Sequence, residues 1–196
     1  MFKTPIDIGA PDFIIDCSQY SSSLSIYESL RLHNVKQLYA YVICYKNFTN
    51  TYEALKIGQS CSLPGGGKVT CHGERLKRQL AFFPGWSDPR PRSSNSSDAW
   101  YNVQTEISLG RINPKINKDS LLVGVWNLDQ RKHNVQVYTR MISDIPEWAE
   151  GELAMQYKKL HNGFLPILNY ADPTGNTAYR QCNVNVDHLS KFVTFS

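Results

Sequence analysis

The chain has 196 residues, a length that suffices for one domain with a full core. Of these residues 41% are hydrophobic and 19% charged, which is an ordinary composition for a globular protein. No apolar run approaches the length of a membrane helix and the N-terminus lacks the apolar segment of a signal peptide, so we expect an intracellular protein, in the cytoplasm of a bacterial or phage-infected cell. The net charge of +4 fits a polyanionic partner without requiring one.

The five cysteines show no CxxC spacing, which indicates reduced thiols in a reducing compartment.

Residues 1–35 combine short apolar pieces with a serine run and are expected to form an N-terminal arm. Within this arm, a short helix is predicted over residues 26–33. Ser23 or Ser25 is its expected N-cap.

Two strands are predicted next. Residues 38–45 alternate and are rich in aromatic and β-branched side chains, and residues 55–60 form a shorter apolar strand closed by Gly58. Because side chains alternate along a strand, Tyr39 and Tyr41 should face the same side. An aromatic strand face with no chemical role remains an open alternative for these tyrosines.

A glycine-rich loop over residues 61–72 lacks the spacing of a phosphate-binding P-loop, which argues against nucleoside triphosphate binding. A basic helix is predicted over residues 73–83, with Leu76, Leu80 and Phe83 as its apolar stripe. Arg75 and Gln79 are one turn apart and share a face. A solvated basic surface is the alternative interpretation of the charges on this helix.

Residues 84–120 are poor in apolar side chains and read as an insertion, with a breaker-rich mobile loop over 87–98 and a short helix or strand over 100–107. Strands are predicted over 121–126 and 135–141. Residues 171–196 are expected to form a C-terminal extension with a short final strand over 191–195.

A second helix is predicted over residues 144–162, with Asp144 as N-cap and a buried stripe of Leu153, Tyr157 and Leu160. Glu150 lies on the inward side, where a carboxylate requires a cation or a metal to offset its desolvation. Glu152 is expected on a different, more exposed face.

These pieces resemble the GIY-YIG nuclease superfamily, over residues 37–80 and 121–170. The matches to the motifs of that family, in chain order, are Tyr39 or Tyr41 for the GIY tyrosine, Lys56-Ile57-Gly58 for YIG, Arg75 for the catalytic arginine, Glu150 for the catalytic glutamate and Asn169 for the closing segment 166–169. The chain departs from the pattern in having no glycine at the GIY position. It also has lysine in place of the YIG tyrosine, as in a branch with KIG.

The resemblance implies an α+β fold with a small, mostly antiparallel sheet flanked by helices, spanning residues 36–170 with the insertion at 84–120. It implies a metal-dependent DNA endonuclease of restriction, homing or phage type. Mg²⁺ (or Mn²⁺) would be held by Glu150, with Glu152 as second choice. Arg75 would hold the scissile phosphate through its planar guanidinium.

The same resemblance makes Tyr41 or Tyr39 the general base. Lys56 would lower the pKa of that tyrosine or orient the attacking water. Asn169 would brace the site by hydrogen bonding, and His72 is a secondary candidate for proton transfer.

Contacts to DNA are expected to position the backbone without reading bases. The side chains expected to make them are Lys77, Arg78, Gln79, Arg90 and Arg92, with Lys158 and Lys159 as further candidates. A homodimer is an option because small nucleases that cut both strands often dimerise. The alternatives are a catalytically weak nucleic-acid-binding module on the same fold, or an unrelated α+β protein.

Overall fold

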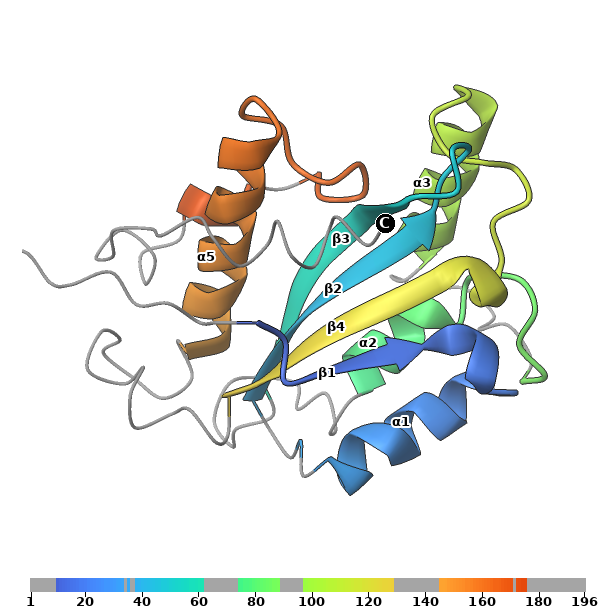
Figure 1. The fold of residues 1–196 in the computed structure, drawn as a ribbon, viewed down its shortest axis with the longest axis horizontal. Coiled ribbons are helices and arrows are strands. Elements are labelled where there is room, and N and C mark those ends of the chain that lie inside the picture. Colours follow the sequence, from blue (N-terminus) through green and yellow to red (C-terminus); the bar gives the residue numbers. More distant parts are fainter. Residues whose placement is uncertain are drawn as a thin grey trace, which may run out of the picture.

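A four-stranded antiparallel sheet lies at the centre of the molecule, in the order β1-β4-β2-β3 (Figure 1). The computed structural model describes residues 10–33, 35, 38–61, 74–88, 97–128, 145–170 and 172–175. The strands are β1 (Phe13–Asp16), β2 (Leu38–Lys46), β3 (Tyr52–Cys61) and β4 (Leu121–Asn127). The helices are α1 (Ser23–Leu32), α2 (Glu74–Leu80), α3 (Ser97–Ser108) and α5 (Ile145–Leu160), with short 3-10 turns η1 (Cys17–Gln19), η2 (Lys118–Ser120) and η5 (Pro173–Gly175). The expected α+β class with an antiparallel sheet is confirmed.

Side-chain alternation along β2 divides the core into two clusters, one on each face of the sheet. Tyr39, Tyr41 and Ile43 pack with apolar residues of α1, α2 and α3. Ala40 and Val42 pack with residues of α5 on the opposite face. The first cluster includes all three residues of the stripe predicted for a helix over 73–83, but α2 ends at Leu80, so Leu76 and Leu80 lie on the helix and Phe83 lies beyond its end. Helices therefore cover both faces of the sheet, and β3 is an edge strand.

Strand β3 differs from its predicted form in length and in regularity. It runs from Tyr52 to Cys61 and so extends beyond the predicted residues 55–60 at both ends, and Gly58 lies within it rather than closing it. Its pairing with β2 also contains a bulge, because Ile43 pairs with Lys56 while the next residue of β2 pairs with Ala54. The extra residue, Leu55, is consequently buried on the same face as Ile43.

Of the residues expected to form an N-terminal arm, the described ones, 10–33 and 35, include a strand and a helix that pack with the rest of the fold. Strand β1 pairs with β4, and α1 buries Ile26 and Leu30 in the core. The helix starts earlier than predicted, with Ser22 as N-cap: its hydroxyl accepts the amide of Ser25 and its own amide donates to the Ser25 hydroxyl.

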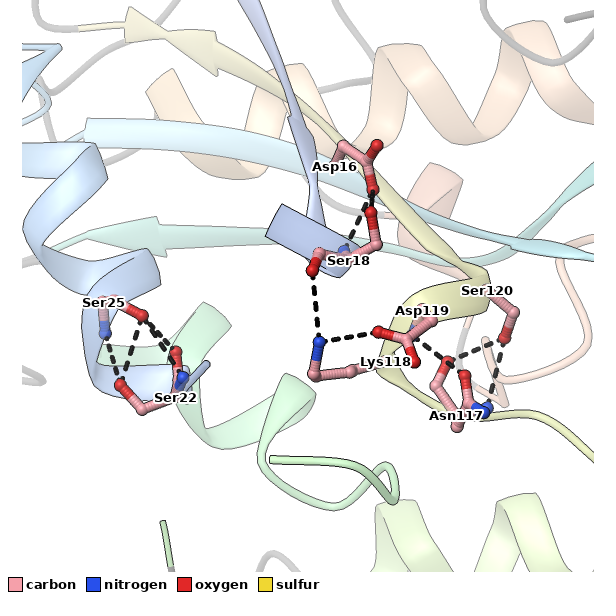
Figure 2. A network of polar contacts seen from close by, with 8 residues as sticks. All are labelled: Asp16, Ser18, Ser22, Ser25, Asn117, Lys118, Asp119 and Ser120. Carbon is pink, nitrogen blue, oxygen red and sulfur yellow. Dashed lines mark hydrogen bonds and ion pairs between the residues drawn. The ribbon is translucent and has the colours of Figure 1, made fainter. Parts of the chain in front are cut away.

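Polar contacts connect the insertion to the N-terminal segment (Figure 2). The ammonium of Lys118 in η2 donates to the carbonyl of Ser18 in η1 at 3.3 Å and to the carboxylate of Asp119 at 2.6 Å. The Asp88 carboxylate, which follows α2, accepts the amide and hydroxyl of Ser23 at the start of α1. These contacts fix both ends of the insertion on the face of the sheet that carries α1 and α2.

The remaining predictions fall partly within the described residues. Residues 100–107 belong to the helix α3, 121–126 form β4, and α5 covers most of the predicted helix. Leu153 and Tyr157 are buried as expected, whereas Leu160 is 41% exposed. The predicted strands at 135–141 and 191–195, the N-cap at 144 and most of the loop at 87–98 lie outside the described residues. None of the described helices is long and apolar enough to cross a membrane.

Candidate active site

Tyr41 and Gly58 lie opposite each other across the pairing of β2 with β3. The tyrosine ring crosses over the glycine so closely that a Cβ at position 58 would lie 2.5 Å from both Cζ and Oη of Tyr41. Such a contact is far inside the van der Waals distance. The glycine of the KIG motif is therefore required because it leaves room for the tyrosine.

Tyr39 shares this face of the sheet, as the alternation predicts, with its ring centroid 6.0 Å from that of Tyr41. Its hydroxyl accepts the backbone amide of Leu76 at 3.4 Å, in the first turn of α2. Burial raises the pKa of Tyr39 to about 12. Tyr39 thus satisfies a free amide at a helix start, a structural task.

Tyr41 has the opposite character. Its side chain is fully buried, and its hydroxyl has no hydrogen-bond partner among the described residues. Burial raises the pKa of Tyr41 far above its usual range; the nearby Tyr39 and Glu150 add to this shift, and Arg75 opposes it. An unsatisfied buried hydroxyl costs about 1–3 kcal/mol, so a group that hydrogen-bonds to it would be bound favourably.

Three charged side chains from three different elements interact with one another, and two of them, Arg75 and Glu150, also act on Tyr41. Arg75 comes from α2, Lys56 from the bulge in β3, and Glu150 from α5 on the other face of the sheet. Arg75 is exposed, whereas Lys56 and Glu150 are half-buried. The structure thus brings four of the predicted site residues together at the edge strand β3.

The electrostatics of the group are set mainly by burial. Desolvation raises the pKa of Glu150 to about 7; Arg75 and Lys56 oppose the shift, and Glu147, one turn earlier in α5, adds to it. The pKa of Lys56 is lowered by burial and then by Arg75, while Glu150 acts in the other direction. Both shifts bring the pKa of the group closer to neutral pH. The carboxylate and the amine are therefore suited to proton transfer, and the carboxylate also to binding a cation.

Asn169 holds the segment after α5 against the free edge of β3. Its side-chain oxygen accepts the amide of Ile57 at 2.7 Å, and its side-chain nitrogen donates to the carbonyl of Ile57 at 2.9 Å. The amide of Leu168 donates to the carbonyl of Leu55, the bulge residue, at 2.9 Å. This segment therefore supplies hydrogen-bond partners to the free edge of β3 at Ile57, the residue between Lys56 and Gly58.

The two candidate metal ligands differ in their surroundings. No hydrogen bond or ion pair joins Glu150 to another described side chain, so its carboxylate oxygens are available to a cation. Within the described residues no three His, Cys, Asp or Glu side chains form a complete ligand set. One carboxylate fits an ion such as Mg²⁺, which keeps several waters and shares substrate phosphate oxygens.

The prediction that Glu152 is exposed is wrong. Its side chain is fully buried, and one of its oxygens accepts the side-chain amide of Gln156, one turn later, at 3.0 Å. Because the residue is enclosed in the core, it does not fit the role of a solvent-facing metal ligand.

The residues expected to contact DNA have varied environments. Arg78 is exposed, Lys77 is half-buried beside Asp88, and Gln79 lines a cavity together with Lys56. The Lys158 ammonium forms an ion pair with Asp172 at 2.7 Å. His72, Arg90 and Arg92 lie outside the described residues.

Glu147 was expected only as a residue of the first helical turn, although its spacing of three residues from Glu150 places the two carboxylates side by side on one helix. Comparison of the chain with protein-family models, with curated proteins and with solved structures finds no match. The link to the GIY-YIG superfamily is therefore a resemblance of motifs.

Proposed function

We propose that this protein is a metal-dependent endonuclease of the GIY-YIG type that hydrolyses phosphodiester bonds in DNA. The observation that carries the proposal is that the charges of Arg75, Lys56 and Glu150 interact with one another, and that Arg75 and Glu150 also act on Tyr41, whose hydroxyl has no partner among the described residues. A guanidinium, an amine, a carboxylate and a phenol at one place match the needs of phosphodiester hydrolysis, namely charge stabilisation and proton transfer.

Arg75 is the residue best suited to bind the scissile phosphate. It is exposed while interacting with the half-buried charges, and its planar guanidinium can donate two parallel hydrogen bonds to phosphate oxygens. The exposed Arg78 on the same helix offers positive charge to the phosphates of the DNA backbone next to the scissile one.

Lys56 is a better proton acceptor for the attacking water than either tyrosine. Burial and Arg75 lower the pKa of Lys56, whereas burial raises the pKa of Tyr41. A base is most effective when its pKa is near the working pH. In this assignment Tyr41 keeps its proton. Its hydroxyl is enclosed in the free protein, so a hydrogen bond to the water or to a phosphate oxygen requires the bound substrate to displace the groups that cover it.

Glu150 is the residue that would hold a divalent ion. Such an ion, Mg²⁺ or Mn²⁺, would stabilise the negative charge that develops on the phosphate and on the leaving oxygen. Since the pKa of Glu150 is about 7, loss of its proton at neutral pH is incomplete without a cation. Glu150 should therefore bind metal more tightly as the pH rises through 7.

The enclosure of Tyr41 favours a second candidate function. Its hydroxyl is shielded from solvent and lysine replaces the YIG tyrosine, features compatible with a nucleic-acid-binding module of little activity. The two functions are separated by cleavage of DNA of high sequence complexity with Mg²⁺, using Glu150→Gln beside the wild type. The nuclease loses cleavage in the variant and retains DNA binding, whereas the binding module cleaves in neither form.

A further inference from the structure

Helix α3, part of the insertion, contains an ionisable residue that is almost fully enclosed. Glu106 is 5% exposed, and its carboxylate contacts two partners outside its own helix. One oxygen forms an ion pair with Arg111 at 3.2 Å. The other accepts the hydroxyl of Tyr170 at 3.4 Å. Burying a carboxylate is costly unless its partners are held in place, which suggests that this contact has a function.

The contact joins the insertion to the segment that completes the edge of β3. Tyr170 directly follows Asn169, whose side chain forms both hydrogen bonds to Ile57. On the other side of Asn169, Leu168 lines a cavity together with Val103 of α3 and with Lys56. Helix α3 thus contacts this segment on both sides of Asn169, by packing at Leu168 and by hydrogen bonding at Tyr170.

We propose that Glu106 and Tyr170 are positioning residues that hold Asn169 against β3 and thereby fix Lys56 for the reaction. This inference rests on the proposed function. Neither residue touches the reacting groups in this assignment; they act through the backbone of Ile57, which lies between Lys56 and Gly58. Tyr170 is 61% exposed, so replacing only its hydroxyl leaves the core intact.

The first test is amide hydrogen exchange in the variant Tyr170→Phe. The control is Tyr27→Phe, which also removes one tyrosine hydroxyl. Tyr27 is half-buried on α1 and forms no hydrogen bond to a described residue. Loss of one hydrogen bond should speed exchange of the Ile57 and Leu168 amides about fivefold. Exchange in the pairing of β1 with β4 should not change. Unchanged exchange at Ile57 and Leu168 would overturn the inference.

The second test is steady-state cleavage by the same variants. Tyr170→Phe should lower kcat about fivefold with KM unchanged, because substrate contacts remain while Lys56 is less well placed. Glu106→Gln keeps an acceptor for the Tyr170 hydroxyl and should retain more kcat than Glu106→Leu. Faster exchange with an unchanged kcat would overturn the positioning role. Absence of cleavage by the wild type contradicts the proposed function and the catalytic part of this inference. The exchange data do not depend on activity, so they show separately whether the contact between Glu106 and Tyr170 holds Asn169 against β3.

Discussion

At the scale of single residues, the two tyrosines of β2 show how one strand face can carry both a structural and a chemical group. Tyr39 accepts an amide at the start of α2, while the Tyr41 hydroxyl is buried without a described partner. Loss of the hydroxyl should therefore have opposite effects on the free energy of unfolding at these two tyrosines, although they are neighbours on the same face.

Tyr41→Phe should leave the free energy of unfolding unchanged or raise it by about 1 kcal/mol, because it removes an unsatisfied buried polar group. Tyr39→Phe should lower it by about 1 kcal/mol, because a helix amide loses its acceptor. Urea denaturation of both variants measures the difference. If Tyr41→Phe were the less stable of the two, the Tyr41 hydroxyl would have to have a partner in the folded protein.

Gly58→Ala should destabilise the protein by about 1–3 kcal/mol, since its Cβ would meet the Tyr41 ring at 2.5 Å. The same variant should lose cleavage because the ring must move. The control is the double variant Gly58→Ala/Tyr41→Leu, in which the clash is gone and the two effects should be less than additive. Strict additivity would contradict the proposed contact.

At the scale of elements, the bulge and the segment after α5 determine the site. Lys56 pairs with Ile43 and so faces the side that carries α2, and the bulge adds Leu55 on the same face. Asn169 pairs with the outer edge of β3. An edge strand covered in this way is also protected from pairing with another chain.

Asn169→Ala should lower the free energy of unfolding by about 1–3 kcal/mol, because both backbone groups of Ile57 lose their partner. Asn169→Asp serves as the comparison, since it keeps the acceptor for the Ile57 amide and removes the donor to the Ile57 carbonyl. Thermal denaturation should place Asp between Asn and Ala at neutral pH. An alanine variant as stable as the wild type would show that the edge contact is not formed.

Much of this arrangement follows from local sequence patterns. Alternation places Tyr39 and Tyr41 on one face, and helical spacing places Leu76 and Leu80 in the core. The bulge at Leu55 could not be predicted, because it depends on how β3 pairs with a particular neighbour rather than on its own sequence.

Other errors have the same origin in contacts between distant residues. The four residues of β1 are too few to give a strand pattern, and their partner β4 lies more than 100 residues away. The burial of Glu152 was missed because helical spacing identifies one apolar stripe, whereas α5 buries side chains over a wider part of its surface.

At the scale of the whole molecule, the site requires the complete fold, because Arg75 and Glu150 belong to helices on opposite faces of the sheet. Their charges meet at the edge strand. Folding therefore brings the carboxylate of Glu150 into a partly buried site where its negative charge is destabilised. The free energy of unfolding should consequently depend on pH and on the binding of a metal ion.

Glu150 should make the metal-free protein less stable as the pH rises from about 4.5 to about 7. The carboxyl loses its proton near pH 4.5 in the unfolded chain and near 7 in the folded one, so the folded state binds more protons in this range. The cost at pH 8 is roughly 3 kcal/mol.

Glu150→Gln should therefore be more stable than the wild type at pH 8 and equally stable near pH 4, as measured by urea denaturation in EDTA. Glu28→Gln, a change at an exposed glutamate of α1, is the control for net charge. Addition of Mn²⁺ at pH 8 should stabilise the wild type and not Glu150→Gln. A constant difference across this pH range would contradict the raised pKa.

Cleavage of DNA of high sequence complexity by wild type, Arg75→Ala and Glu150→Gln, with Mg²⁺ and with EDTA, tests the central claim most directly. If Glu150 binds the metal and Arg75 binds the phosphate, the wild type cleaves the DNA, discretely or progressively, with Mg²⁺ only. Either variant then loses at least a hundredfold in cleavage, about 3 kcal/mol of transition-state stabilisation, with the fold intact. Cleavage by the wild type in EDTA, or equal cleavage by wild type and both variants, would contradict the assignment of this site.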